Sequence, residues 1–420
     1  MILSFPFIEA TIVSRIILII CSLVILKEAQ AYENMTSSVD PGTFVREAEA
    51  CRVFSSTFYR TVGEKLKDSN IVSSPLSVHL LLSYLTHGAK GRTAEEMMNG
   101  LTLSDIERWH IGYKGLLSSL NGPAKSDLLV ANSVFLKNGV ELLPDFSSIG
   151  ADFYDFTVSN LDFTNSAESA GEINSWAMKK THDKINNIIS ADDITDDTQM
   201  ILANAIYFKG SWQFPFDVEK TTPKNFHVSK DVVKRVATMS QKKRFRHGDL
   251  PELKARYIEI PYTDDNLSLV VVLPTEIDGL SYLEKNFNWN LVLTADYTQK
   301  ETILHLPKFI VESKIDLKEI LQKVGLLAMF ENSADLSGIA NVPLKVSKIL
   351  QKAFIEVNEF GTEAAAVTVG QIRLKRMVHE PDEFNVDRPF MIAIRHKPSD
   401  IPLFVGSVRD IGETIPKDEL

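Results

Sequence analysis

The stretch EVNEFGTEAAAVTVGQIRLKRM, residues Glu356–Met377, joins two segments with opposite chemical requirements. Its first half, residues 361–369, is small, apolar and β-branched, and its single charge is on Glu363. Such a segment can lie exposed as a loop, but residues of this kind fit better as a strand in a sheet. Its second half, residues 373–376, is the basic tetrapeptide RLKR, which requires water or carboxylates around it. The sequence therefore predicts a strand-like arm that presents a basic cleavage site.

The first half of this arm is similar to the hinge of inhibitory serpins. The residues that carry the similarity are Gly361, Thr362, Glu363, Ala364, Ala365 and Ala366. An ordinary loop rarely needs three alanines after Gly-Thr-Glu, because turns favour Gly, Pro, Asn, Asp and Ser. Other serpin-like motifs extend the similarity over nearly all of residues 50–410. They are Asn70 with Ser74-Pro75-Leu76-Ser77, Gly88-Ala89, Trp176 with residues 181–185, the apolar run that ends at Trp212, residues 334–339, and the pair 388–394 and 402–406.

This resemblance implies an α+β serpin fold, in which helices surround a large mixed central sheet and smaller sheets, and residues 361–385 form an exposed reactive-centre loop. We find no internal repeat or linker after Tyr32, which favours one continuous domain. The chain then divides into a signal peptide (1–31), an N-terminal extension (32–45), a serpin domain (46–411) and a C-terminal tail (412–420).

The resemblance also implies a set of residues that control the opening of the central sheet. We assign this role to Ser74, Asn204, Trp212 and Gln351. Gln351 stands where many serpins have a histidine. Unlike histidine, glutamine does not titrate, but its amide offers a hydrogen-bond donor and an acceptor that could bond toward Asn204 or Ser74. Phe360 is a second departure, because many inhibitory serpins carry a charged residue there.

Inhibitory serpins act as a trap, and the resemblance implies the same mechanism here. The protease attacks the loop and forms an acyl-enzyme. The cut loop then enters the main sheet as a new strand and distorts the protease before deacylation. Rapid insertion requires small side chains, no proline and few buried charges, which residues 364–366 satisfy. Val367, Thr368 and Val369 add strand propensity, and alternation should leave Glu363 on the solvent-facing side.

The basic half of the arm predicts the class of protease. Arg373-Leu374-Lys375-Arg376 fits Arg-x-Lys-Arg, the site cut by furin-like proprotein convertases, which are subtilisin-like enzymes. Their carboxylate-lined pockets favour arginine, which can pair with a carboxylate in a bidentate manner. The reactive bond would then join Arg376 and Met377. Serpin spacing counted from Gly361 instead gives Lys375-Arg376, a bond for a trypsin-like protease. We favour Arg376, because four matched subsites outweigh one extra residue in a flexible loop.

Both ends of the chain carry signals of the secretory pathway. Arg15 precedes the apolar run 16–26, and Ala29-Gln30-Ala31 provides a small-x-small cleavage site. This run of eleven residues, apolar except for Ser22, is too short to span a bilayer. The last four residues, Lys417-Asp418-Glu419-Leu420, form the KDEL address that the KDEL receptor reads. We therefore expect a protein of the endoplasmic reticulum lumen and secretory pathway, partly secreted. The combination resembles insect serpins with a convertase-type loop and a retrieval signal.

Composition excludes several classes of function. The chain of 420 residues is 44% hydrophobic and 24% charged, and its net charge of −10 argues against broad nucleic-acid binding.

Cys21 leaves with the signal peptide, so Cys51 is a lone thiol that we expect to be buried. The sequons at Asn34 and Asn266 are open to glycosylation.

We find no motif of an enzyme and no histidines at the helical spacing of a metal site, so we expect neither catalysis nor a metal or cofactor. The expected protein is a monomer whose partner is a serine protease. The basic run 242–246 could bind a sulfated polysaccharide, but we favour a solvated loop.

The hydrophobic pattern predicts the main helices and strands. We expect helices at 47–66, 75–85, 172–189 and 316–329, and strands at 128–136, 200–212, 266–274, 303–311 and 344–357. Thr93 and Glu96 have the spacing of a capping box at the start of a further helix.

Two other functions remain open on the sequence. One is a non-inhibitory binding serpin, such as a collagen chaperone of the endoplasmic reticulum, against which the alanine-rich hinge argues. The other is an inhibitor of a trypsin-like extracellular protease that cuts after Lys375.

Overall fold

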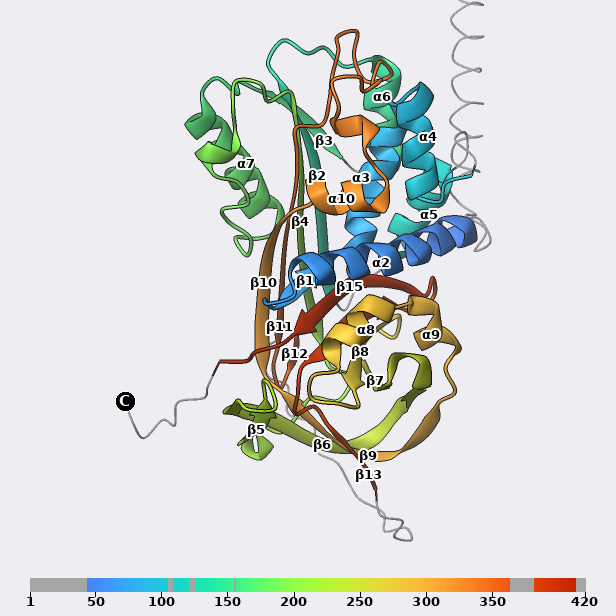
Figure 1. Ribbon diagram of the computed structural model, residues 1–420, viewed down its shortest axis with the longest axis vertical. Coiled ribbons are helices and arrows are strands. Elements are labelled where there is room, and N and C mark those ends of the chain that lie inside the picture. Colours follow the sequence, from blue (N-terminus) through green and yellow to red (C-terminus); the bar gives the residue numbers. More distant parts are fainter. Residues whose placement is uncertain (1–43, 105–108, 121–125, 155, 363–380, 413–420) are drawn as a thin grey trace, which may run out of the picture.

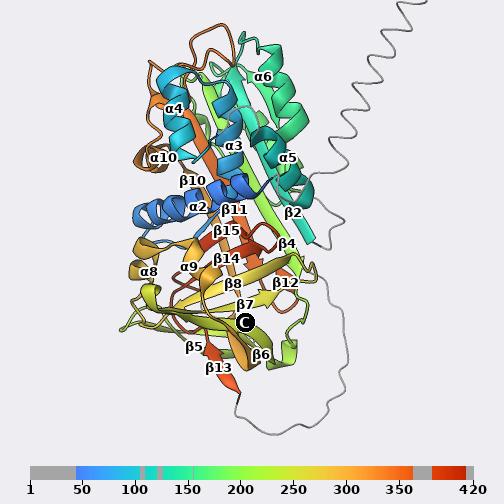
Figure 2. The same ribbon diagram turned by 90° about the vertical axis from the view of Figure 1, so that its right-hand side faces the viewer.

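The computed structural model describes residues 44–104, 109–120, 126–154, 156–362 and 381–412. Two β-sheets form the framework and helices cover them, as Figures 1 and 2 show from two sides. This is the α+β arrangement that the sequence predicted. Within the described ranges, no helix is both long and apolar enough to cross a membrane.

The main sheet has six strands. Its path is β10 (Phe309–Asp316), β11 (Lys348–Val357), β4 (Met200–Ser211), β2 (Ser126–Lys137) and β3 (Thr157–Leu161), and β12 (Gly361–Thr362) pairs with β4 off this path. β4 is buried over almost its whole length, which explains its continuous apolar sequence. β11 and β4 are parallel neighbours, paired from Lys348↔Ile201 to Phe354↔Tyr207.

The second sheet has nine strands and carries the other anchor of the loop. Its order is β1 (Ile71–Ser73), β15 (Ile401–Val408), β14 (Phe390–His396), β8 (Leu267–Pro274), β7 (Ala255–Pro261), β6 (Val233–Leu250), β9 (Thr298–Pro307) and β13 (Asp382–Asn385), with β5 (Thr222–His227) paired to β6. β13 runs parallel to β9 at the edge of this sheet. The 19 residues between β12 and β13 therefore connect two different sheets.

Helices cover the two sheets. They are α2 (Val45–Lys65), α3 (Pro75–His87), α4 (Gly91–Gly100), α5 (Trp109–Leu120), α6 (Pro144–Ile149), α7 (Ser166–Lys180), α8 (Leu280–Asn286), α9 (Trp289–Thr294) and α10 (Lys318–Val324). α3 begins with Ser74 as N-cap and Pro75 in its first turn, and nearly every side chain in it is buried. α7 stands apart on the opposite face, over its own apolar cluster.

The helix predicted at 172–189 is wrong at both ends. α7 begins at Ser166, where the Asn165 side chain caps it, and it ends at Lys180. His182 and Asp183 have φ values of +49° and +63°, which an α-helix cannot contain. The isoleucines beyond Lys180 are nevertheless buried in the same cluster, so their spacing reflects packing of an irregular segment.

The predicted capping box is also wrong. α4 begins at Gly91, and neither Thr93 nor Glu96 caps it. Thr93 Oγ1 accepts a hydrogen bond from the Asp335 N–H at 3.0 Å. The Glu96 carboxylate accepts from the N–H groups of Leu327 and Ala328. Both side chains therefore join α4 to a distant segment.

Three other predicted elements are shorter or divided. The helix predicted at 316–329 ends at Val324, where Gly325 has a φ of +103°. Strand 303–311 is interrupted at Lys308, which separates β9 from β10. Strand 344–357 begins only at Lys348. The buried state expected for Cys51 is confirmed, and burial raises the pKa of its thiol to about 12.

Buried histidines make the fold sensitive to mild acid. Burial lowers the pKa of His79 from 6.5 to about 4, although the bond from its ring to the Leu101 carbonyl opposes this shift. The unfolded chain then binds the proton more tightly, so stability is full above pH 6.5 and falls as the pH drops toward 4.

We predict that His79 alone lowers the free energy of unfolding by about 2 kcal/mol between pH 7.5 and pH 5. Urea unfolding of the wild type and His79→Gln at both pH values measures this, with exposed His182→Gln as control. His87 and His396 act in the same direction, so His79→Gln should reduce the pH dependence without abolishing it. An unchanged pH dependence would contradict the prediction.

Candidate functional site

The hinge residues Gly361 and Thr362 are paired with the main sheet. They form β12, which runs antiparallel to β4 with the register Gly361↔Ser211 and Thr362↔Gly210. The Thr362 side chain is fully buried, and its Oγ1 lies 2.9 Å from the Tyr262 hydroxyl. The first two residues of the hinge are therefore held in strand geometry beside β4.

A tight turn between β11 and β12 is held through its carbonyl groups. The Trp212 indole N–H donates to the Asn358 carbonyl at 2.9 Å, and its backbone N–H donates to the Phe360 carbonyl at 3.0 Å. The Phe216 N–H donates to the Glu359 carbonyl at 2.8 Å. Trp212 thus acts at the hinge. Phe360 takes part through its backbone, which any residue could provide.

Glycine is required where the hinge returns along β4. Gly361 has a φ of +147°, a conformation that other residues rarely adopt. A Cβ at this position would lie 2.0 Å from the Gly210 carbonyl oxygen. The close approach of the two backbones explains why the hinge begins with this residue.

Glu359 ties the same turn to two other elements. Its side chain is 5% exposed and pairs with Lys308 Nζ at 2.9 Å, while the Thr221 hydroxyl donates to its other oxygen at 2.8 Å. Burial raises the pKa of the carboxyl group, but the bonds from Lys308, its own backbone and Thr221 outweigh burial and leave the pKa lowered. Glu359 is therefore held as a carboxylate.

A second cluster lies in the middle of the sheet, around Gln351. The Gln351 amide N–H donates to Asn204 Oδ1 at 2.7 Å and to the Ser74 carbonyl at 3.1 Å. Its side-chain oxygen accepts from the Ser74 N–H at 3.0 Å and from the Ser73 hydroxyl. Gln351 and Asn204 are directly opposite each other in the β11–β4 pairing. The glutamine thus joins both strands to the start of α3.

Asn132 extends this cluster to β2. Asn204 Nδ2 donates to Asn132 Oδ1 at 2.6 Å and also to the Ser77 hydroxyl, and Ser77 Oγ donates to Asn132 Oδ1 at 3.4 Å. The Ser74 hydroxyl donates to the Leu403 carbonyl at 2.6 Å. We call Ser74, Ser77, Asn132, Asn204 and Gln351 the central polar cluster. All five side chains are buried.

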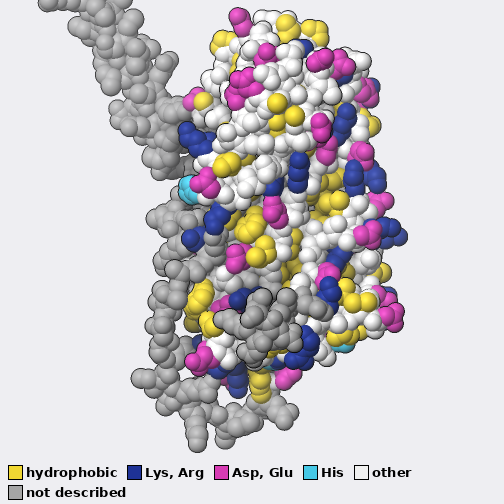
Figure 3. All heavy atoms as spheres, turned by 90° about the vertical axis from the view of Figure 1, so that its left-hand side faces the viewer, with side chains coloured by type: hydrophobic (Ala, Val, Ile, Leu, Met, Phe, Trp, Pro, Cys, Tyr) yellow, Lys and Arg dark blue, Asp and Glu magenta, His cyan; other side chains and the backbone are white. Residues whose placement is uncertain are grey.

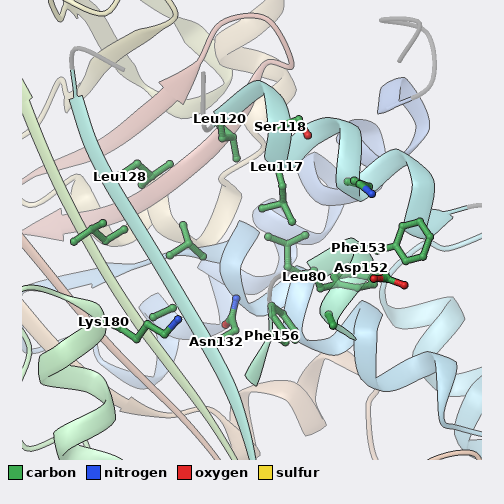
Figure 4. Close-up of a pocket in the computed structure, with 16 residues that line it drawn as sticks. Leu80, Leu117, Ser118, Leu120, Leu128, Asn132, Asp152, Phe153, Phe156 and Lys180 are labelled. Carbon is green, nitrogen blue, oxygen red and sulfur yellow. The ribbon is translucent and has the colours of Figure 1, made fainter. Parts of the chain in front are cut away.

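A cavity of about 350 Å³ lies beside this cluster (Figure 4). α5 and β2 form its two long walls, and Asn132 belongs both to its lining and to the central polar cluster. The cavity is separate from the turn that holds the hinge.

Several predicted site residues lie outside the described residues. They are Glu363, Ala364, Ala365 and Ala366 of the hinge, Arg373, Leu374, Lys375, Arg376 and Met377 of the reactive segment, Asn34, and Lys417, Asp418, Glu419 and Leu420. Asn266 is described: it is exposed in the turn between β7 and β8, where an attached glycan would extend into solvent.

The basic run 242–246 is not the loop that we predicted. It lies within β6, where Lys242 pairs with Glu301 at 2.9 Å and Lys243 lies 4.8 Å from the centre of the Phe214 ring. On the face drawn in Figure 3, basic and acidic side chains are interspersed, without a large patch of one sign. Across the described ranges, no three metal-ligating side chains gather into a cluster.

Sequence reasoning missed Asn132, Glu359 and Lys308. Asn132 was recognisable, because it is a polar residue on the face of β2 that Val130 and Val134 share by alternation. Glu359 precedes the hinge and is one acidic residue among several, so nothing in its surroundings distinguishes it. Its partner Lys308 is 51 residues away, a distance at which no local pattern operates.

We predict that Glu359→Lys lowers the free energy of unfolding by about 1–3 kcal/mol, because two cations would then face each other at a buried turn. Glu359→Gln should cost less, since it keeps the bond to Thr221. Thermal unfolding of both variants measures the difference. The exchanged pair, Glu359→Lys with Lys308→Glu, should recover part of the loss. Equal effects of the lysine and glutamine variants would contradict this account.

Comparison with known proteins identifies the family. Residues 49–411 match the family model for serpin, serine protease inhibitor. The chain is 35% identical over 370 residues to the leukocyte elastase inhibitor of Xenopus tropicalis, covering 86% of this chain and 98% of that protein. It is 34% identical to alaserpin of Manduca sexta, over 84% of this chain and 91% of that one.

A solved structure agrees with these sequence matches. Serpin48 of Tenebrio molitor, a highly specific insect serpin, superimposes with a TM-score of 0.81 at 32% identity, covering 87% of this chain and 98% of that chain. Relatives of this kind are protease inhibitors and not enzymes. The fold and the sequence agree, and the chain belongs to the serpin family.

Proposed function

We propose that this protein inhibits a serine protease by inserting its cleaved loop into the main sheet. The observation that carries the proposal is the pairing of Gly361 and Thr362 with β4. The hinge already follows the strand direction and register that an inserted loop would continue. The protein would then be a suicide substrate rather than an enzyme.

The register of β12 defines what insertion would bring together. Each further hinge residue would lie opposite the preceding residue of β4, so Glu363 would face Lys209 and Ala364 would face Phe208. The first pair joins opposite charges across two strands, which is favourable. The second places a small side chain against the apolar core. Continuing along β4, Thr368 would arrive opposite Asn204.

Insertion requires that β11 separate from β4. The pairs from Lys348↔Ile201 to Phe354↔Tyr207 would break, and the bond from Gln351 to Asn204 would break with them. The new strand would replace these backbone bonds on both sides, and the Thr368 hydroxyl would enter between Gln351 and Asn204. The inserted state thus gains one strand without leaving the central amides unpaired, which lowers its free energy.

Arg373, Leu374, Lys375 and Arg376 support a furin-like proprotein convertase as the target, with cleavage between Arg376 and Met377. The signal peptide and the C-terminal KDEL sequence support the same choice, because they would keep the inhibitor in the secretory pathway where convertases mature. The KDEL receptor is then a second partner. A trypsin-like protease that cuts after Lys375 is the other candidate.

The test is to mix the mature chain with furin or trypsin and to analyse the products on a denaturing gel, with N-terminal sequencing of the released peptide. We expect a band at the summed mass with furin and a peptide that begins at Met377. A peptide that begins at Arg376 would assign the reactive position to Lys375 and favour the trypsin-like target. Cleavage without any complex would contradict inhibition.

A hinge substitution tests the insertion step itself. Thr362 is already buried in the sheet of the intact chain, so the test position is Ala364, which would lie opposite Phe208 after insertion. Ala364→Arg should prevent insertion while the protease still cuts the loop. We expect the covalent complex to fall by about tenfold or more, because burial of an unpaired cation costs several kcal/mol. Glu363→Gln is the control, since alternation should place this neighbouring residue on the other face of the sheet, and glutamine puts no cation opposite Lys209. Equal trapping by both variants would exclude this geometry.

The non-inhibitory binding serpin remains the rival function. Heat stability separates the two, because insertion adds a strand to the main sheet and its hydrogen bonds. If the protein is inhibitory, cleavage within residues 363–380 by any protease should raise the midpoint of thermal unfolding well above that of the intact chain. An unchanged midpoint would favour the binding function.

A further inference from the structure

We propose that a polar clasp between β11 and the segment 181–199 must break before loop insertion can be completed, and that its release limits the rate of that step. The clasp consists of four residues: Asn186 and Asp193 on the segment, and Lys348 and Lys352 on β11. The segment connects the end of α7 to the start of β4. The proposal rests on the proposed inhibitory function, because it concerns the separation of β11 from β4.

Two hydrogen bonds make up the clasp. Lys348 Nζ donates to Asp193 Oδ1 at 2.7 Å, and Lys352 Nζ donates to the Asn186 carbonyl at 2.6 Å. The two lysine side chains are only 25% and 8% exposed, so solvent screens these bonds less than it screens contacts at the open surface. Leu350 lies between the lysines on the same face of β11 and belongs to the apolar cluster under α7. The clasp is therefore on the side of the main sheet that α7 covers.

Asp193 is held in place for its contact with Lys348. It ends the single helical turn Ala191–Asp193, and its Oδ2 accepts from the Ser190 N–H at 3.0 Å and from the Ser190 hydroxyl at 2.8 Å. Burial raises the pKa of the Asp193 carboxyl group, but the bonds from Lys348 and Ser190 outweigh burial and leave the pKa well below its usual range. Asp193 is therefore a carboxylate in neutral and in mildly acidic solution, and the clasp persists in both.

The two halves of the clasp belong to opposite sides of the seam at which the sheet opens. The segment 181–199 runs directly into β4, and its buried isoleucines share their apolar cluster with side chains of β4 and β2. Among the described buried residues of this cluster, only Leu350 comes from β11. β11 is instead paired with β10 along the whole of β10, from Phe309↔Val357 to Asp316↔Leu350. Opening of the seam therefore moves β11 and β10 together, away from the segment.

The lysines keep carboxylate partners when the seam opens. Lys352 also pairs with Glu312 of β10 at 2.6 Å, and Lys348 lies 3.8 Å from Asp316 at the end of the same strand. Because β10 moves with β11, these contacts need not break. The loss falls on Asp193, which then exchanges a lysine for water. Release of the clasp therefore costs little free energy in the open state, but the bond must still be broken on the way to it.

The position of the clasp along the strands determines when it breaks. In the register of β12, the inserted loop reaches the level of Lys352 with Val367 and the level of Lys348 with Gln371. The hinge half of the loop can thus enter while the contact between Asp193 and Lys348 is intact, whereas complete insertion cannot. A slower last part of insertion leaves the acyl-enzyme more time to hydrolyse. The clasp should therefore increase the fraction of inhibitor that is cleaved without trapping the protease.

Annealing of a synthetic peptide to the intact chain tests the clasp without any protease. A peptide of residues 363–372 is added, and its entry into the sheet is followed by native gel electrophoresis and by the rise in the midpoint of thermal unfolding. Asp193→Asn and Lys348→Met should each anneal about two- to fivefold faster than the wild type. The double variant should be no faster than the faster single variant, because both remove the same contact. Annealing of both single variants at the wild-type rate would overturn the proposal.

Two controls separate the clasp from a general loss of stability. Asp410→Asn removes an ion pair to Lys234, a lysine that is 27% exposed and lies in the second sheet, away from the seam, so this variant should anneal at the wild-type rate. A shorter peptide of residues 363–368 stops before the level of Lys348, so Asp193→Asn should not accelerate it. Equal acceleration of the short and the long peptide would contradict the position assigned to the clasp.

The protease reaction distinguishes failure of the clasp from failure of the inhibitory function. With a protease that the wild type traps, Asp193→Asn should lower the number of inhibitor molecules consumed for each protease trapped. If the wild type traps the protease and anneals the peptide, but Asp193→Asn changes neither this number nor the annealing rate, only the clasp is excluded. If the wild type anneals no peptide and loop cleavage does not raise its thermal stability, the sheet accepts no new strand, and both proposals are excluded.

Discussion

The hydrogen bond from Gln351 to Asn204 keeps the main sheet closed at its centre. It joins β11 to β4, two parallel strands whose partners on the outer sides are antiparallel. Gln351 also bonds to Ser74, so the same side chain fixes the start of α3 behind the sheet. Any strand added between β11 and β4 must break this bond. Opening of the sheet at its centre therefore requires that this amide give up its partner.

Two opposing arrangements meet at the hinge. Gly361 and Thr362 lie in strand register beside β4, whereas a few residues further along β4 the neighbouring position is taken by β11. Further insertion must therefore break the hydrogen bonds between β11 and β4 before the inserted loop can form its own. A free-energy barrier thus separates the closed sheet from the inserted one. Trp212 and Glu359 add to this barrier, because they hold the turn that precedes the hinge. The intact chain can remain closed even if the inserted form has the lower free energy.

Local sequence patterns correctly predicted those parts of the fold that are determined by interactions between residues close in sequence. The apolar run of β4, the Ser74-Pro75 start of α3 and the glycine of the hinge each have a cause within a few residues, and all three are present. The predicted C-terminal end of α7 was wrong, because the buried isoleucines beyond Lys180 have the spacing of a helix although they pack in an irregular segment. The capping role predicted for Glu96 was wrong for a related reason. A helix N-terminus offers free N–H groups, but the Glu96 carboxylate accepts hydrogen bonds from the N–H groups of Leu327 and Ala328 instead. These partners are more than 200 residues away, so no local sequence pattern reveals them.

The side chain at the centre of the sheet, Gln351, has no titratable proton. A histidine there would change charge between the neutral and mildly acidic compartments of the secretory pathway. Gln351 keeps its donor and acceptor over this pH range, so its hydrogen bonds to Asn204 and Ser74 do not depend on pH. His79, whose pKa burial lowers, lies on α3 in contact with Leu101 and Phe54, so its protonation affects the stability of the fold and not the β11–β4 bond. The bond between β11 and β4 is therefore one that acidification leaves intact.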